Sequence, residues 1–123
     1  MPIQQMLLGA GGAAKKTYMD DVFSTYVYTG TGSARTINNG ISLSGDGGML
    51  WHKRRNSTSN HFICDSERGA VQSLYPNHEY AQGNPGQRVT AFTSTGFTVG
   101  TDEEVNGSND EIASWTFRKA KGF

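Results

Sequence analysis

Turn-forming residues interrupt this chain so often that most of its segments have room only for a short strand. Gly accounts for 16 of the 123 residues, and turn pairs recur at short intervals, as in Asn39-Gly40, Gly47-Gly48 and Asn106-Gly107. Leu, Ile, Val and Phe together supply only 22 residues, too few for a large helical bundle. Because the length is that of about one domain, the sequence predicts a single all-β domain of short strands joined by turns.

Between these turns, β-branched and aromatic residues follow the pattern of β-strands. The clearest strand is predicted over 22–29, and residues 61–64 are predicted to pair with the strand at 49–54 as a hairpin. Ile41 and Leu43 alternate with serines in the same way. Further short strands are predicted at 34–37, 71–74, 88–93, 96–100 and 112–119. About eight strands at this spacing predict an antiparallel β-sandwich, such as a jelly roll, with at most one helical turn near 20–24.

Period-two alternation assigns side chains to faces within these strands. It places Trp51 with Met49 on one face of its strand, and Trp115 with Phe117 on one face of the last strand. An exposed tryptophan can serve as a platform for a sugar ring, but we favour the interpretation that both tryptophans belong to the sandwich core. In the strand at 88–93, Val89 and Ala91 are expected to share a face.

The first sixteen residues differ in composition from the rest. Residues 9–14 read GAGGAA and cannot build a core, whereas four apolar side chains lie close together just before them, at Ile3, Met6, Leu7 and Leu8. A frayed terminus is one interpretation. We favour a flexible arm that becomes ordered on a partner, because clustered apolar residues are unusual in a solvated tail. The predicted organisation is therefore a docking arm at 1–16, with these four residues as contacts, and a β-sandwich at 17–123.

Charge and composition exclude several classes of function. The formal net charge is zero, which argues against nucleic-acid binding because phosphate contacts need a basic excess. No segment approaches the ~20 apolar residues of a membrane span. Lys15 and Lys16 follow the short apolar run instead of preceding it, so no signal peptide is predicted and synthesis in the cytoplasm is expected. The single cysteine, Cys64, is expected to be a small buried hydrophobic residue.

The titratable residues do not form a recognisable catalytic or metal-binding motif. We expect no enzymatic activity, no cofactor and no metal site. Five acids of the 101–111 stretch offer oxygen ligands for calcium, but their spacing favours an exposed, solvated acidic loop: Asp102, Glu103, Glu104, Asp110 and Glu111. Asp65 and Arg68 are expected to form a structural pair at a turn closed by Gly69. The alternative is that Arg68 holds a sugar or a phosphate.

The longest irregular stretch, 75–87, is the best candidate for a surface recognition loop. It carries Tyr75, His78 and Tyr80, which are well placed for a ligand or for a neighbouring chain. With Arg68, these residues are the candidate ligand-binding set.

Seven segments, taken in order, resemble a module found in tail-fibre and other tail-associated proteins of bacteriophages. They are 26–32 (YVYTGTG), 37–43 (INNGISL), 47–54 (GGMLWHKR), 65–70 (DSERGA), 92–100 (FTSTGFTVG), 105–106 (VN) and 113–119 (ASWTFRK). The similarity runs from about residue 18 to 123. The resemblance implies a lectin-like, concanavalin-like β-sandwich carried on a virion tail protein, usually as a homotrimer.

Similar chains commonly continue past the equivalent of residue 120, which makes this chain a compact fibre protein or the N-terminal, tail-attaching part of a longer fibre. The expected function is therefore that of a structural virion protein of a phage tail, which assembles onto other tail proteins through its arm. Two alternatives remain open. One is a carbohydrate-binding module that recognises a glycan on the host surface through the 75–87 loop, and the other is a head decoration protein.

Overall fold

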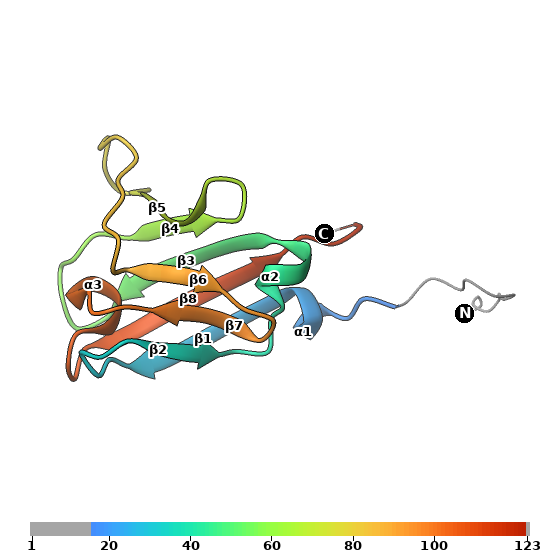
Figure 1. Cartoon of the computed structure of the whole chain (residues 1–123), viewed down its shortest axis with the longest axis horizontal. Coiled ribbons are helices and arrows are strands. Elements are labelled where there is room, and N and C mark those ends of the chain that lie inside the picture. Colours follow the sequence, from blue (N-terminus) through green and yellow to red (C-terminus); the bar gives the residue numbers. More distant parts are fainter. Residues whose placement is uncertain (1–15, 123) are drawn as a thin grey trace, which may run out of the picture.

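The computed structural model describes residues 16–122, which form an antiparallel β-sandwich of two sheets (Figure 1). The larger sheet has the strand order β1 (Phe23–Thr29), β8 (Glu111–Arg118), β3 (Gly48–Arg54), β4 (Phe62–Asp65) and β5 (Gly69–Leu74). The smaller sheet has the order β2 (Arg35–Asn38), β7 (Gly96–Val99) and β6 (Val89–Phe92). The all-β sandwich that the sequence predicts is confirmed, and nearly all of the predicted arm lies outside the described residues.

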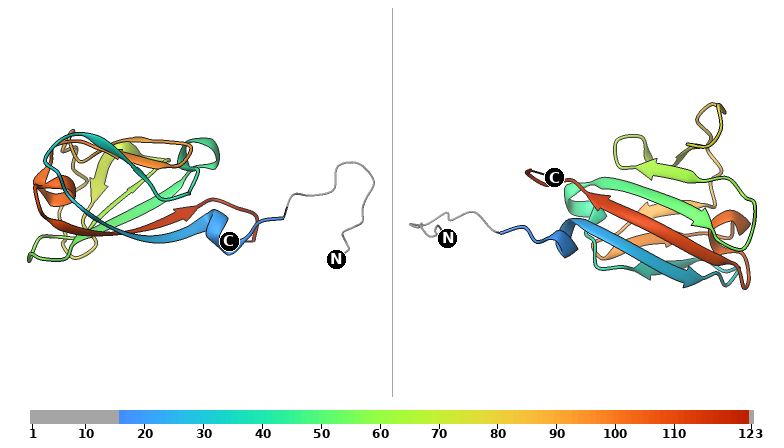
Figure 2. Two further views of the ribbon diagram at one scale, coloured as in Figure 1. Left: turned by 90° about the horizontal axis from the view of Figure 1, so that it is seen from below. Right: turned by 180° about the vertical axis from the view of Figure 1, so that it is seen from behind.

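Strand pairing follows the sequence pattern closely in the larger sheet. The predicted hairpin is confirmed, since β3 and β4 pair with Trp51 opposite Ile63. Strand β8 lies between β1 and β3, so that Trp115 is opposite both Thr25 and Trp51. In Figure 2 the smaller sheet covers only one face of this larger sheet. The larger sheet therefore has an inner face, toward the smaller sheet, and an outer face.

The core fills the space between the two sheets. The larger sheet contributes Leu50, Phe62 and Cys64, all buried. The smaller sheet and its connections contribute Ile37, Val89, Phe97, Val99 and Val105. Cys64 is thus a small buried hydrophobic residue, as the sequence predicts.

Strand β6 departs from the predicted alternation. Val89 pairs with Val99 and is buried, but Ala91 pairs with Thr98 and is exposed. The register shifts between these two pairs, which is the effect of a β-bulge that adds one residue to one strand. The prediction that Val89 and Ala91 share a face is therefore wrong.

Three single helical turns lie within residues 16–122, one before the first strand and two between strands. They are α1 (Met19–Val22), α2 (Leu43–Asp46) and α3 (Glu103–Asn106). The turn expected near 20–24 forms slightly earlier as α1, where the Tyr18 backbone N–H donates to Asp21 Oδ2 at 3.0 Å. The alternating residues 41–44 do not continue as a strand. Instead α2 begins at Leu43, and the backbone N–H groups of Leu43 and Ser44 donate to the carbonyl of Thr93.

The stretch 101–111 is not the exposed acidic loop that its composition suggests. It contains α3, whose Val105 and Asn106 are fully buried at one end of the sandwich. The chain passes so close to β1 there that a Cβ on Gly30 would lie 2.1 Å from the carbonyl oxygen of Gly107. The prediction of a solvated loop is wrong, because Val105 and Asn106, which lie between its acids in the sequence, bury their side chains and close the core.

Candidate interaction surfaces

The 75–87 loop brings together three of the predicted ligand-binding residues. The His78 and Tyr80 rings are stacked, with an interplanar angle of 1° and centroids 4.4 Å apart. The Tyr75 and Tyr80 rings meet edge to face at 5.5 Å. Tyr80 is 57% exposed, so this cluster presents an aromatic surface to solvent beside β5, at the edge of the larger sheet.

Tyr75 is the anchor of this cluster and not its exposed part. Its ring meets the buried Phe62 ring at 5.3 Å, and its hydroxyl accepts a hydrogen bond from Arg88 Nη1 at 3.4 Å. The Arg88 guanidinium lies over the Phe62 ring, 3.7 Å from its centroid. Tyr75 therefore fixes the base of the loop on the core, and the surface that the loop offers to a ligand is made by His78 and Tyr80.

Arg68 does not join this cluster, because it lies in the β4–β5 turn and is engaged there. Its guanidinium forms an ion pair with Asp65 Oδ2, and its backbone N–H donates to Asp65 Oδ1 at 2.8 Å. Gly69 closes the turn at a φ of 100°, a conformation that favours glycine. The predicted structural pair of Asp65 and Arg68 is confirmed.

Both tryptophans lie on the outer face of the larger sheet. Their strand neighbours Leu50 and Thr116 point inward and are fully buried, whereas Trp51 and Trp115 are half-buried and absent from the core. Their rings meet at 6.0 Å with an interplanar angle of 65°. The prediction that they form the sandwich core is wrong, since β3 and β8 carry apolar side chains on both faces and the inner face is filled by the smaller ones.

The outer face is largely apolar where these strands run together. The paired registers align the side chains of Phe23, Phe117 and Met49 in one row and those of Trp115, Trp51 and Ile63 in the next. Val27, on the same face of the edge strand β1, is 57% exposed. We call this set the outer apolar face. Exposed apolar surface gathered in one place is a common sign of an interaction site.

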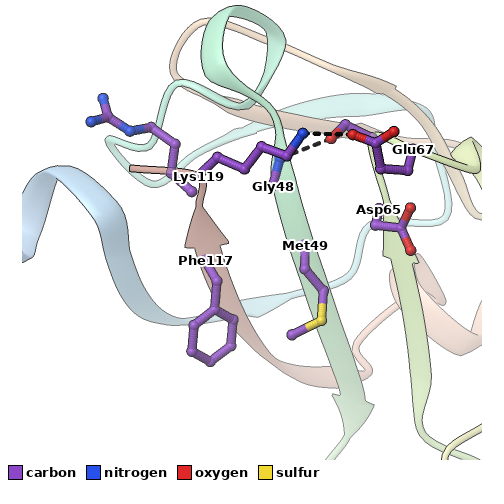
Figure 3. Close-up of a pocket in the computed structure, with 8 residues that line it drawn as sticks. Gly48, Met49, Asp65, Glu67, Phe117 and Lys119 are labelled. Carbon is purple, nitrogen blue, oxygen red and sulfur yellow. Dashed lines mark hydrogen bonds and ion pairs between the residues drawn. The ribbon is translucent and has the colours of Figure 1, made fainter. Parts of the chain in front are cut away.

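Among the described residues, two hollows open on this face. One, of about 190 Å³, is lined by Trp51, His61, Trp115 and Phe117, and we call it the tryptophan hollow. Within it, Trp51 Nε1–H donates to His61 Nδ1 at 3.0 Å. The other, of about 410 Å³, lies at the end of the sheet and is lined by Gly48, Met49, Asp65, Ser66, Glu67, Phe117, Arg118 and Lys119 (Figure 3).

Charged groups border the second hollow and pair with each other. Lys119 Nζ lies 2.5 Å from Glu67 Oε1, and this hydrogen bond raises the pKa of Lys119. Figure 3 marks the contact with a dashed line. Arg118 Nη1 lies 3.4 Å from Asp46 Oδ2. The hollow therefore combines an apolar floor of Met49 and Phe117 with a paired, charged border.

Three of the five acids predicted as possible calcium ligands bond to separate partners. Asp102 Oδ1 accepts the Glu104 backbone N–H at 2.8 Å and lies 3.5 Å from Arg88 Nε. Asp110 Oδ1 pairs with Arg54 Nη2 at 2.7 Å, and Glu111 pairs with Arg55. Within residues 16–122, no three His, Cys, Asp or Glu side chains lie together as a metal site would require.

Three buried titratable groups keep their uncharged forms at neutral pH. Burial lowers the pKa of His52 to about 3, with a further contribution from the positive charge of Arg88. Burial raises the pKa of Cys64 to about 12 and also raises the pKa of Tyr28. None of the three lines either hollow, so these groups serve the core.

We expect His52 to make the fold sensitive to mild acid. It is 1% exposed, its ring meets Phe97 at 5.1 Å, and its Nε2 has no hydrogen-bond partner within residues 16–122. The unfolded chain binds a proton at this side chain below about pH 6.5, whereas the folded chain does so only near pH 3. Stability is therefore lost as the pH falls through this window, by about 2 kcal/mol between pH 6.5 and 5.

Urea unfolding of the wild type and of His52→Leu at pH 7.5, 6.5 and 5.0 measures this contribution. The variant lacks the titrating group, so its free energy of unfolding is expected to change much less over the same range. Equal losses in the two proteins would show that His52 is not the source.

The candidate partner-binding residues Ile3, Met6, Leu7 and Leu8 lie outside the described residues, so their contacts stay a prediction.

Sequence reasoning missed the outer apolar face. The sequence does carry a signal for this face. Met49, Trp51, Trp115 and Phe117 alternate with other apolar or small side chains in the same strands, so that both faces of each strand can pack against a neighbour. Within residues 16–122, no helix has both the length and the apolar character needed to cross a membrane.

Comparison with known families shows a match that covers most of the chain. The model of a family described as Domain of unknown function (DUF7483) matches residues 19–122, a range that begins with α1 and includes both sheets. No curated protein matches the chain, and no solved structure matches it.

Proposed function

This chain belongs to the family described as Domain of unknown function (DUF7483), and we propose that it is a structural protein of a bacteriophage tail. It is either a tail-fibre protein or the tail-attaching N-terminal part of one. It acts by assembly: the N-terminal arm docks on a neighbouring tail protein while the sandwich packs against other copies. The ordered motifs that resemble tail-associated proteins support the location in the virion.

The observation that carries the assembly role is the outer apolar face. A sandwich of this size needs one buried core, and that core lies between the two sheets. The row of Trp115, Trp51 and Ile63 on the opposite side of the larger sheet adds nothing to it. Half-exposed aromatic side chains are enriched at the centres of protein interfaces, where a partner completes their burial. This supports a protein whose outer apolar face is buried by neighbouring molecules in an assembly.

Quantitative mass spectrometry of purified particles tests the proposal. We expect a few copies of the chain per virion, as for a tail component. Deletion of residues 2–16 is expected to abolish incorporation, with circular dichroism unchanged because the sandwich begins after the deletion. Hundreds of copies per particle would identify a head decoration protein. Undiminished incorporation of the truncated chain would contradict docking through the arm.

The aromatic surface of the 75–87 loop supports a second candidate, a carbohydrate-binding module that recognises the host surface. A stacked His78–Tyr80 pair with an exposed tyrosine is suited to packing against the apolar face of a sugar ring.

A glycan array or a whole-cell binding assay tests this candidate. If it is right, Tyr80→Ala reduces binding at least about tenfold, in line with the loss of one aromatic contact. Tyr26→Ala serves as the matched control, because Tyr26 is an exposed tyrosine on β1, away from the loop. Equal binding by wild type and Tyr80→Ala would exclude the loop as the site.

A further inference from the structure

The tryptophan hollow has the chemistry of a pocket for aliphatic side chains. Its walls are the rings of Trp51, Trp115 and Phe117, and the Trp51 N–H is already bonded to His61 Nδ1. A sugar would bring hydroxyl groups that need hydrogen-bond partners, and an unmet hydroxyl in such a pocket carries a desolvation penalty. The two tryptophan rings are also inclined at 65°, so they offer no shared plane for a saccharide.

The chain itself contains a segment of matching chemistry. Ile3, Met6, Leu7 and Leu8 place four apolar side chains within six residues. This segment precedes β1, the edge strand of the same sheet, and Phe23 at the start of β1 packs on Phe117 with ring centroids 4.9 Å apart. The apolar segment is thus tethered at the end of the outer apolar face.

The path of the described chain favours a neighbouring molecule over the same one. Residues 16–18 lead away from the sandwich beyond α1 (Figure 1). Residues 9–15 lie between Leu8 and Lys16 and span at most about 25 Å when extended. A chain that continues outward therefore carries Leu7 and Leu8 toward another molecule, whereas docking on its own sheet requires it to reverse.

We propose that the apolar segment 3–8 of one copy inserts into the tryptophan hollow of a second copy, with Leu7 and Leu8 as its main contacts. This inference rests on the proposed assembly role and names the partner: a copy of the same chain. Each copy then donates one segment and receives one, as in a reciprocal dimer or in a closed ring. The two tryptophans of the chain both lie at this contact.

Cysteine cross-linking in the full chain tests the contact directly. Thr25 is exposed on β1 opposite Trp115, and Thr36 is exposed on β2 in the other sheet. We expect Leu7→Cys combined with Thr25→Cys to form disulfide-linked oligomers under mild oxidation, and the matched pair Leu7→Cys with Thr36→Cys to remain monomeric on a non-reducing gel. The native Cys64 is buried and does not compete.

Three outcomes would overturn the proposal. A 7–25 disulfide formed within one chain would place the segment on its own sheet. No cross-link at 7–25 would mean that another partner occupies the hollow. Equal yields from the 7–25 and 7–36 pairs would mean unspecific collision.

Self-association of the full chain provides a second measurement. We expect wild type to form oligomers by light scattering, with tryptophan emission shifting to the blue as concentration rises. Leu7→Asp with Leu8→Asp should weaken association at least about 100-fold, which is about 2.7 kcal/mol, and abolish the shift. A monomeric wild type, or unchanged association in the variant, contradicts the proposal. Unchanged self-association of the double variant, combined with its loss from particles, would refute this partner while leaving docking of the arm on another tail protein intact.

Discussion

Replacing Asn106 with Ala is expected to lower the free energy of unfolding by about 3–4 kcal/mol, because three backbone groups lose a hydrogen-bond partner at a fully buried side chain. The Asn106 side chain accepts the Thr31 N–H at 3.1 Å and donates to the carbonyls of Ser33 at 2.6 Å and Gly100 at 2.8 Å. One amide thus holds two positions of the β1–β2 connection, and also the segment after β7. Urea unfolding at pH 7.5, fitted as a two-state transition, measures the loss.

Two further variants serve as comparisons for Asn106→Ala. Ser108→Ala changes an exposed side chain two residues away and is expected to alter stability by less than about 0.5 kcal/mol. Asn106→Asp keeps the shape and the acceptor for Thr31 but turns an oxygen toward two carbonyls, so it is expected to be destabilising as well. If the urea midpoint of Asn106→Ala equals that of the wild type, water replaces the side-chain amide without loss of stability.

Phe97→Ala is expected to destabilise the fold by about 3–5 kcal/mol, which is a large part of the stability of a domain of this size. Phe97 is the largest fully buried side chain within residues 16–122. It lies between the sheets, with His52 at 5.1 Å and Tyr28 at 6.3 Å between ring centroids. Removal of the ring leaves a cavity where the two sheets meet, and the rigid strands on both sides limit collapse into it.

Phe92→Ala provides a matched control, because Phe92 is only partly buried at the edge of the same core. It is expected to cost less than about 2 kcal/mol. Thermal and urea unfolding of both variants measure the difference. If the two substitutions cost the same, the core is not centred on Phe97 as the packing indicates.

Much of this fold can be predicted from the sequence because the turns are explicit. Gly48 and the residues that follow it start a strand, and the polar stretch before His61 separates two alternating segments that can only pair as a hairpin. Such local signals identify β3, β4, β7 and β8 nearly to the residue. They do not reveal the bulge in β6, because whether Ala91 faces in or out depends on the partner strand and not on its own neighbours.

The candidate surfaces were harder to predict, for a physical reason. Alternation along β3 separates Met49 and Trp51 from Leu50 and His52, but both sets are largely apolar and either could face the smaller sheet. Only the tertiary pairing decides it, and the space between the sheets is filled by Leu50 and the neutral His52. The loop cluster was within reach of sequence reasoning, since Tyr75, His78 and Tyr80 lie close together in the chain. Arg68 does not belong to this cluster, because its ion pair with Asp65, which the sequence also predicts, keeps it in the β4–β5 turn.

The antiparallel pairing of β1 with β8 also determines how the domain responds to force. The pair Phe23–Phe117 joins the start of β1 to the end of β8, so the chain enters and leaves the sandwich at one end (Figure 1). Tension applied between those two points peels β1 from β8 one hydrogen bond at a time instead of shearing all of them together. A domain with this geometry yields at low load when pulled through its chain ends.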